Sequence, residues 1–137
     1  MLVKEYSSGA KLISGFITPS ECKDLIVNSE AQGFEEAKIN TGYGQEMFKE
    51  IRNNDRVFFD DSVLAEKLYH KLAPYLPDKV GSWRLHALNE RFRFYRYTSD
   101  QYFRWHCDGS YERSFDEISK VTSMSYLNDD FDGGETE

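Results

Sequence analysis

Cysteine and long hydrophobic runs are scarce in this chain, and their scarcity excludes several classes of protein. Two cysteines among 137 residues, Cys22 and Cys107, are too few for a disulfide framework, so we expect free thiols. No apolar stretch approaches the roughly 20 residues that cross a bilayer, and the first ten residues lack the apolar core of a signal peptide. We therefore expect a cytoplasmic protein with no membrane partner.

Positive charge is also in deficit. The chain has 17 Lys and Arg residues against 24 Asp and Glu residues, which gives a formal net charge of −7. Binding to nucleic acids or anionic membranes relies on Lys and Arg that displace counterions from phosphates. We expect no nucleic-acid partner, and a basic peptide or protein suits this acidic chain better.

Aromatic residues are abundant instead, at 15% of the sequence. This composition is typical of a folded, strand-rich protein, and the length fits one domain. The pattern along the chain is helical first and strand-like later. We predict a single α+β domain over residues 1–137, with an N-terminal helical part over 1–82 and a β core that starts within 83–137.

Two helices are predicted in the first part. Thr18, Pro19 and Glu21 have the spacing of an N-cap, a first-turn proline and a capping box, and Gly33 ends this helix, whose inner face is Cys22, Leu25, Ile26 and Ser29. The second helix lies in residues 60–77, where leucines recur every four residues at 64, 68 and 72. Between them, residues 40–57 are predicted to be a long surface loop that leads into a short strand at 56–60.

Strand patterns dominate after residue 83. In residues 89–97 Phe92 and Phe94 alternate with Arg93 and Tyr95, which predicts a strand. Further strands are predicted at 102–106 and at 120–128, where Thr122, Met124 and Tyr126 share one face.

The segment "FRWHCDGSYERSF" holds the strongest chemical signal. In an extended segment residues i and i+2 project to the same side, so His106 and Asp108 can reach one metal ion while Cys107 points away. One imidazole and one carboxylate are two-thirds of the 2-His-1-carboxylate triad of non-haem Fe(II) oxygenases. Taken alone, however, a His-x-Asp pair is more often a surface hydrogen-bonded pair.

Two other signals point less clearly to chemistry. Asn128, Asp130, Asp132 and Gly133 match the opening positions of a calcium loop, but the preceding segment has a strand pattern where a helix is required, so a solvated acidic turn is the better interpretation. His70 lies in the second helix with no other ligand type three or four positions away, which favours a plain surface position.

Several features in order resemble the prolyl 4-hydroxylase-like branch of the Fe(II)- and 2-oxoglutarate-dependent dioxygenases. They are Tyr97, then Phe103, then His106-x-Asp108, then a strand from Thr122 to Leu127 that carries Tyr126, then the turn Gly133-Gly134-Glu135-Thr136. The resemblance covers about the last 50 residues. It implies a double-stranded β-helix core of the jelly-roll or cupin type with supporting N-terminal helices.

The resemblance also implies an activity and a role for each matching residue. The reaction is hydroxylation of an unactivated C–H, most typically of a prolyl residue in a peptide or protein, with release of succinate and CO₂. Fe(II), 2-oxoglutarate and O₂ take part, and ascorbate serves as reductant. The implied roles are iron ligation by His106 and Asp108, cosubstrate binding by Tyr97, Thr122 and Tyr126, and lining of the substrate side by Phe103.

Two residues that complete this pattern are not in the sequence. The family places a distal histidine and an Arg or Lys well downstream of the double-glycine turn, whereas the sequence stops at Glu137. Three interpretations stay open: His86 and Arg93 replace them, the sequence continues into the remaining strands, or the chain is a degenerate member that acts as a binding module. The second is favoured, because a β-helix cut here leaves unpaired edges.

Overall fold

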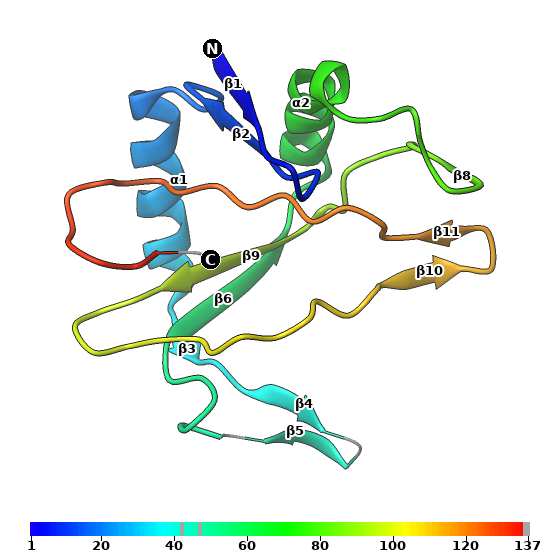
Figure 1. The fold of residues 1–137 in the computed structure, drawn as a ribbon. Coiled ribbons are helices and arrows are strands. Elements are labelled where there is room, and N and C mark those ends of the chain that lie inside the picture. The colour runs from blue at the N-terminus through cyan, green and yellow to red at the C-terminus, as the bar shows by residue number, and fades with distance from the viewer. Residues whose placement is uncertain (42, 47, 136–137) are drawn as a thin grey trace.

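The computed structural model describes residues 1–41, 43–46 and 48–135 of the chain. Figure 1 shows the described elements, which in chain order are β1 (Leu2–Glu5), β2 (Lys11–Ser14), α1 (Pro19–Gln32), β3 (Glu35–Glu36), β4 (Ile39–Thr41), β5 (Gly44–Glu46), β6 (Asp55–Asp60), α2 (Ser62–Leu72), the 3₁₀ turn η1 (Ala73–Tyr75), β7 (Lys79–Val80), β8 (Trp83–Arg84), β9 (Arg91–Arg96), β10 (Glu112–Ser114) and β11 (Glu117–Ile118).

Helix α1 begins and ends at the predicted residues. The Thr18 hydroxyl accepts a hydrogen bond from the Glu21 amide at 3.2 Å, and the Glu21 carboxylate accepts one from the Thr18 amide at 2.9 Å. Gly33 ends the helix with φ of 84°, a conformation that glycine adopts at low cost. The predicted inner face is confirmed, since Ser29 is buried and Cys22, Leu25 and Ile26 are half-buried.

Helix α2 is also confirmed. Asp61 caps it by accepting a hydrogen bond from the Leu64 amide at 2.9 Å. Leu72 is buried and Leu64 and Leu68 are half-buried, as their spacing predicts, while His70 is exposed. Lys67 of α2 donates to the Glu21 carboxylate at 2.6 Å and thereby links the two helices.

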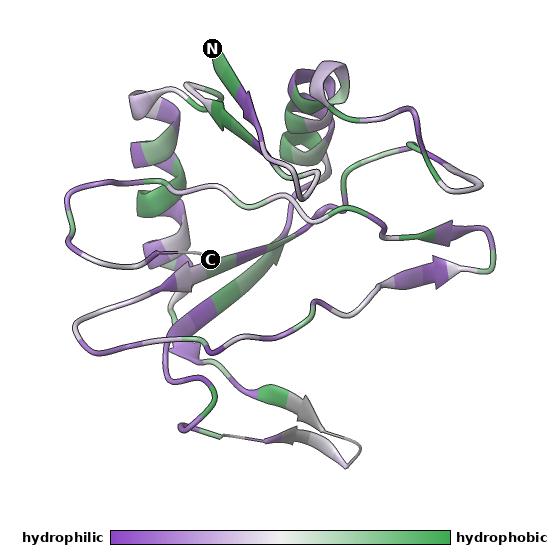
Figure 2. Cartoon of the chain, in the orientation of Figure 1, coloured by the Kyte–Doolittle hydropathy of each residue, from purple (hydrophilic) through white to green (hydrophobic). Residues whose placement is uncertain are grey.

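The longest ladder is β6 paired antiparallel with β9, and β3 adds to the other edge of β6. Asp55 lies opposite Arg96 and Asp60 opposite Arg91, so both ends of the ladder carry ion pairs. The predicted alternation along β9 is confirmed, with Phe92 and Phe94 half-buried and the residues between them exposed. Figure 2 shows this alternation as purple and green bands along β9.

Several short hairpins were not predicted from the sequence. Residues 40–57 are not one long loop, because β4 pairs with β5 to form a hairpin there. The pairs β1–β2, β7–β8 and β10–β11 are likewise short hairpins. Strands of two to four residues are too short to show a period of two. The prediction of a loop over 40–57 therefore rested on the glycine and amide residues of that segment. Figure 1 shows β1–β2 near the helices and β4–β5 at the opposite end of the molecule.

Two predicted strands are wrong in the described chain. Residues 102–106 contribute a single bridge, Arg52 to Phe103, and residues 120–128 form no strand. A strand exists only when a neighbour takes up its backbone hydrogen bonds, and no described segment lies in ladder contact with 120–128. The double-stranded β-helix therefore stays a prediction.

The C-terminal turn is exposed. Gly133 and Gly134 adopt φ of 77° and 74°, which suits glycine, and Thr136 of the same motif lies outside the described residues. Residues 120–127 do not form the helix that a calcium loop needs. Neither helix of the described residues has the length and hydropathy of a transmembrane span.

Candidate metal centre

The segment that carries His106 and Asp108 is anchored to residues 51–54, just before β6. The Arg104 amide donates to the Ile51 carbonyl at 3.0 Å, and the Asn53 amide donates to the Tyr102 carbonyl at 3.2 Å. The Asn53 side chain in turn accepts from the Tyr102 amide at 2.7 Å. Asp100, in the preceding turn, adopts φ of 65°, which Asp tolerates better than most residues. These contacts hold the start of the candidate site against the β6–β9 ladder.

His106 and Asp108 do lie on the same side, as their spacing predicts. The His106 Nε2 and Asp108 Oδ1 atoms are 3.4 Å apart. Ligands that bind one divalent ion at about 2.1 Å and at right angles lie about 3.0 Å apart. A small rotation of either side chain therefore brings both atoms onto one ion.

The other ring nitrogen fixes the tautomer of His106. Nδ1 is 2.8 Å from the Arg104 carbonyl oxygen, and since a carbonyl only accepts, Nδ1 carries the proton. In the neutral ring Nε2 is then a bare acceptor that faces a second acceptor, the Asp108 carboxylate. Such a pair needs a cation or a second ring proton between its atoms. Metal-binding histidines generally donate their other N–H to a carbonyl or carboxylate in this way.

Thr122 orients the carboxylate of Asp108. Its hydroxyl donates to Asp108 Oδ2 at 2.9 Å, which leaves Oδ1 to face His106. The resemblance implied a contact of Thr122 with the cosubstrate, whereas the contact in the structure is with Asp108, the predicted iron ligand. Tyr126, on the same segment, donates to the Gly134 carbonyl at 3.5 Å, and its side chain is largely exposed.

Tyr97 lies close to the charged and aromatic residues of the site. Burial raises the pKa of Tyr97 above its ordinary value, the nearby charge of Arg52 opposes this, and Tyr95 and Tyr126 add to the rise. Its hydroxyl therefore stays protonated at neutral pH and can donate a hydrogen bond.

Phe103 connects the candidate ligand to a residue that the sequence did not single out. Its ring stacks on the His106 imidazole, with centroids 3.6 Å apart and an interplanar angle of 15°. The guanidinium of Arg52 also lies over the Phe103 ring, 4.2 Å from its centroid. Arg52 falls in the segment predicted to be a surface loop, where a single arginine gives no signal of function.

The donor set fits a divalent metal ion but supplies only two ligands. A neutral imidazole nitrogen and a carboxylate oxygen suit Fe(II) and similar ions. Among the described residues no group of three His, Cys, Asp or Glu side chains could hold a metal. His86 is therefore not the third ligand in this arrangement. Arg93 is exposed on β9 and shares the strand face of Tyr95, opposite Phe92 and Phe94, so its role in cosubstrate binding stays a prediction.

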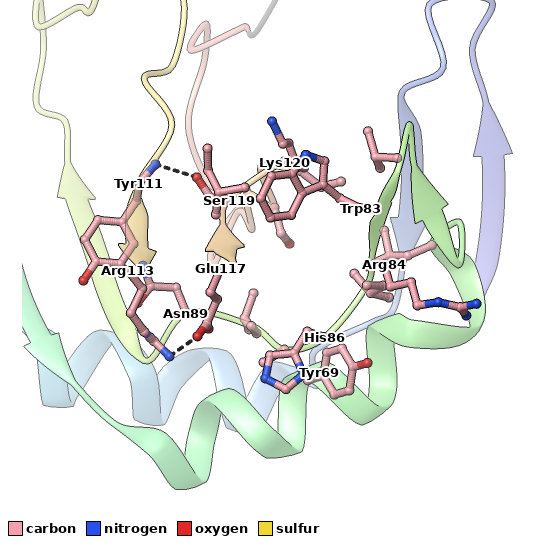
Figure 3. A pocket seen from close by; sticks show the side chains of 18 of the residues that line it. Tyr69, Trp83, Arg84, His86, Asn89, Tyr111, Arg113, Glu117, Ser119 and Lys120 are labelled. Atoms are coloured by element: carbon pink, nitrogen blue, oxygen red, sulfur yellow. Dashed lines mark hydrogen bonds and ion pairs between the residues drawn. The ribbon is translucent and has the colours of Figure 1, made fainter. Parts of the chain in front are cut away.

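His86 belongs to a pocket of about 400 Å³ instead. Figure 3 shows it beside Tyr69 of α2, in a wall that also includes Trp83. Val121 and Ser123 line this pocket, whereas Thr122 between them contacts Asp108. The same short segment therefore contributes both to the pocket and to the contact with Asp108.

The functional interpretation rests on the residues of this centre and not on similarity to known proteins. Comparison of the chain with protein-family models, with curated proteins and with solved structures finds no match in any of the three.

Proposed function

We propose that this chain is an Fe(II)- and 2-oxoglutarate-dependent dioxygenase that hydroxylates an unactivated C–H, with a prolyl residue of a peptide or protein as the best candidate substrate. The proposal joins the ordered motif from Tyr97 to the double-glycine turn with the geometry of one pair of side chains. It names the reaction class more firmly than the substrate, because one fold hosts many substrates.

A single observation carries the proposal. The Arg104 carbonyl holds the proton of His106 on Nδ1, and Thr122 holds one oxygen of Asp108, so that Nε2 and the other oxygen face each other at 3.4 Å. Two acceptors oriented by outside partners are what a metal ion requires.

The side chains of this centre have separate tasks. Fe(II), once bound with 2-oxoglutarate, supplies the chemistry that converts 2-oxoglutarate, O₂ and R–H to succinate, CO₂ and R–OH. His106 and Asp108 hold the ion, and Thr122 keeps the carboxylate in place. The hydroxyl of Tyr97 would donate a hydrogen bond to a carboxylate of the cosubstrate when it is bound.

Aromatic side chains line one side of the site. Phe103 covers one face of the His106 ring, and Tyr95 and Tyr97 lie at the end of β9, where both are partly exposed. The net charge of −7 favours a basic peptide as the substrate, and the free thiols Cys22 and Cys107 suit the cytoplasm.

Succinate formation tests the proposal. The protein is incubated with Fe(II), ascorbate, O₂ and 2-oxoglutarate, and succinate is compared with a His106→Ala variant. A His70→Ala variant is the matched control, because His70 is an exposed histidine on α2. We expect succinate from the wild-type chain and from His70→Ala but not from His106→Ala. Equal succinate from all three would mean that the iron is not held by this pair.

A second candidate function is a metal-binding or peptide-binding module without turnover. The observation that favours it is the count of ligands, since the described residues bring two together and not three. It predicts that the protein binds a divalent ion in a His106-dependent manner and yet forms no succinate. The same set of variants therefore separates the two functions.

A further inference from the structure

Arg52 is a buried cation that no acidic side chain neutralises among the described residues. Its residue surface is only 4% exposed. Its Nε donates to Asn54 Oδ1 at 2.7 Å, and Asn54 is itself fully buried. Its Nη2 is buried without a hydrogen-bond partner in the described part of the chain. Burying a charged group in this way is costly, so other contacts must favour the position.

Those contacts are aromatic faces. The guanidinium carbon lies 4.4 Å from the centroid of the Tyr95 ring and 4.2 Å from that of Phe103. Both distances are well within the range of about 6 Å for a cation–π contact, and such contacts strengthen when water is excluded. Arg52 therefore ties a residue of β9 to a residue of the metal-binding segment.

Phe103, held by Arg52, in turn restricts the orientation of the His106 imidazole. Its ring is nearly parallel to the His106 ring, with 3.6 Å between centroids. The backbone on both sides is also paired, through the bridge between Arg52 and Phe103. A rotation of the His106 ring about its long axis would break the stacking on Phe103, and Phe103 cannot follow it while Arg52 packs on its ring.

We propose that Arg52 is a positioning residue, which holds the His106 imidazole through Phe103 in the orientation that aims Nδ1 at the Arg104 carbonyl and Nε2 at Asp108. The inference rests on the proposed function in that this orientation serves metal binding. The guanidinium is required, because a lysine ammonium carries the same charge but lacks the planar group that packs on aromatic rings. The shape of the guanidinium group, and not its charge alone, therefore explains why an arginine lies at this position.

The first test reads the imidazole in the metal-free protein. Long-range ¹H–¹⁵N NMR at about pH 8, above the ordinary pKa of a histidine side chain, distinguishes the Nδ1–H from the Nε2–H tautomer. The chain has three histidines, so His70→Ala and His106→Ala variants complete the assignment. We expect the Nδ1–H tautomer in the wild-type protein and a mixture of both tautomers in Arg52→Lys.

The matched control is Arg96→Lys. Arg96 lies over the Phe34 ring at 4.5 Å and donates to Glu30 and Asp55, so the variant alters the same kind of contact away from Phe103 and His106. It is expected to keep the wild-type tautomer. A wild-type tautomer in folded Arg52→Lys, or an equal change in Arg96→Lys, would overturn the proposal.

Variants at Phe103 keep the test decisive if Arg52→Lys fails to fold. Phe103→Leu removes the aromatic face, so we expect a mixture of both tautomers of His106. Phe103→Tyr keeps the aromatic face, so we expect the Nδ1–H tautomer. A mixture in both variants, or in neither, contradicts a positioning effect that acts through the Phe103 ring.

Metal binding is measured separately with Co(II), an air-stable substitute for Fe(II). Changes outside the first set of ligands typically weaken metal affinity by about 10- to 100-fold, and we expect Arg52→Lys and Phe103→Leu to weaken Co(II) binding by at least tenfold. If the wild-type chain binds no Co(II), the proposed function fails, while the tautomer experiment still decides the role of Arg52. If Co(II) binds equally to all variants, the positioning role fails and the proposed function stands.

Discussion

Thr122 illustrates how one hydroxyl can join parts of a site that are distant in sequence. It lies 14 residues after Asp108 and donates to its Oδ2 atom at 2.9 Å. Asp108 and Thr122 are both exposed, so the bond contributes little to folding. The hydrogen bond instead orients the Asp108 carboxylate, because it leaves only one oxygen to face His106.

Replacing Thr122 by valine tests this directional role. Valine keeps the branched shape and removes the hydroxyl, so we expect Co(II) affinity to fall by about tenfold while the free energy of unfolding changes by less than about 0.5 kcal/mol. A metal titration and a thermal melt on the same samples measure both. Thr98→Val, in the turn after β9, is the matched control. Unchanged Co(II) affinity in Thr122→Val would remove Thr122 from the metal centre.

The residues of the site differ in how far the sequence reveals them. The closeness of His106 and Asp108 follows from their spacing of two in extended chain, which fixes the side on which each projects. The contact between Thr122 and Asp108 was not predicted, since the resemblance implied only cosubstrate binding for Thr122 and no local rule relates residues 14 positions apart. Arg52 could not be found from sequence, because its burial arises from the packing of three separate segments around it.

At the scale of elements, one carboxylate of helix α1 makes two kinds of contact. Glu21 closes the capping box with Thr18 and also accepts a hydrogen bond from Lys67 of α2. The hydrogen bond from Lys67, followed by those from Thr18, lowers the pKa of Glu21 from 4.5 to about 2. Glu21 is therefore a local cap and a link between helices.

This pKa predicts a pH dependence with a definite sign. The folded state lowers the pKa of Glu21, so its charge stabilises the fold fully above about pH 4.5, and this contribution is lost as the pH falls towards about 2. We expect Glu21→Gln to melt at a lower temperature than wild type at pH 7 and the difference to shrink through that window. Melting curves between pH 7 and pH 2 measure it.

The control for this prediction is Glu66→Gln. Glu66 lies on α2 with a side chain that is 76% exposed, and its contact with His70 is long, at 3.9 Å. Its substitution should leave the melting temperature nearly unchanged at every pH. A difference between Glu21→Gln and wild type that stays constant from pH 7 to pH 2 would assign the effect to the amide side chain and not to the charge.

Length decides which elements the sequence reveals. Helices α1 and α2 and strands β6 and β9 span 6 to 14 residues and show their periodicity or their caps clearly. The hairpins β1–β2 and β10–β11 have strands of two to four residues, which carry no period. Residues 120–128 show the opposite case, since their alternating pattern is real but a strand also needs a pairing neighbour.

At the scale of the whole molecule, the fold leaves much of its surface open. The chain exposes 10661 Å², whereas a compact monomer of this length exposes about 7,400 Å². The buried apolar residues among those described are few and lie on or beside the helices and β6, namely Phe16, Ala37, Val57, Ala65 and Leu72. Large side chains after residue 120, such as Met124, Tyr126 and Phe131, are exposed. Stability should therefore be distributed unevenly along the chain.

Hydrogen exchange followed by mass spectrometry checks this distribution. Strands β6 and β9 share a six-residue ladder, so we expect slow exchange there and in α1 and α2, and fast exchange over 120–135, where the described amides make no backbone hydrogen bonds in the structure. Co(II) should then slow exchange in two separate stretches, 103–108 and the residues around Thr122, because the hydroxyl of Thr122 holds Asp108. The Asp108→Asn variant, which loses a charged ligand, should show no such effect. Protection of 120–135 equal to that of β9 without metal would mean that this segment has packing partners beyond the contacts described, and the uneven distribution would then be wrong.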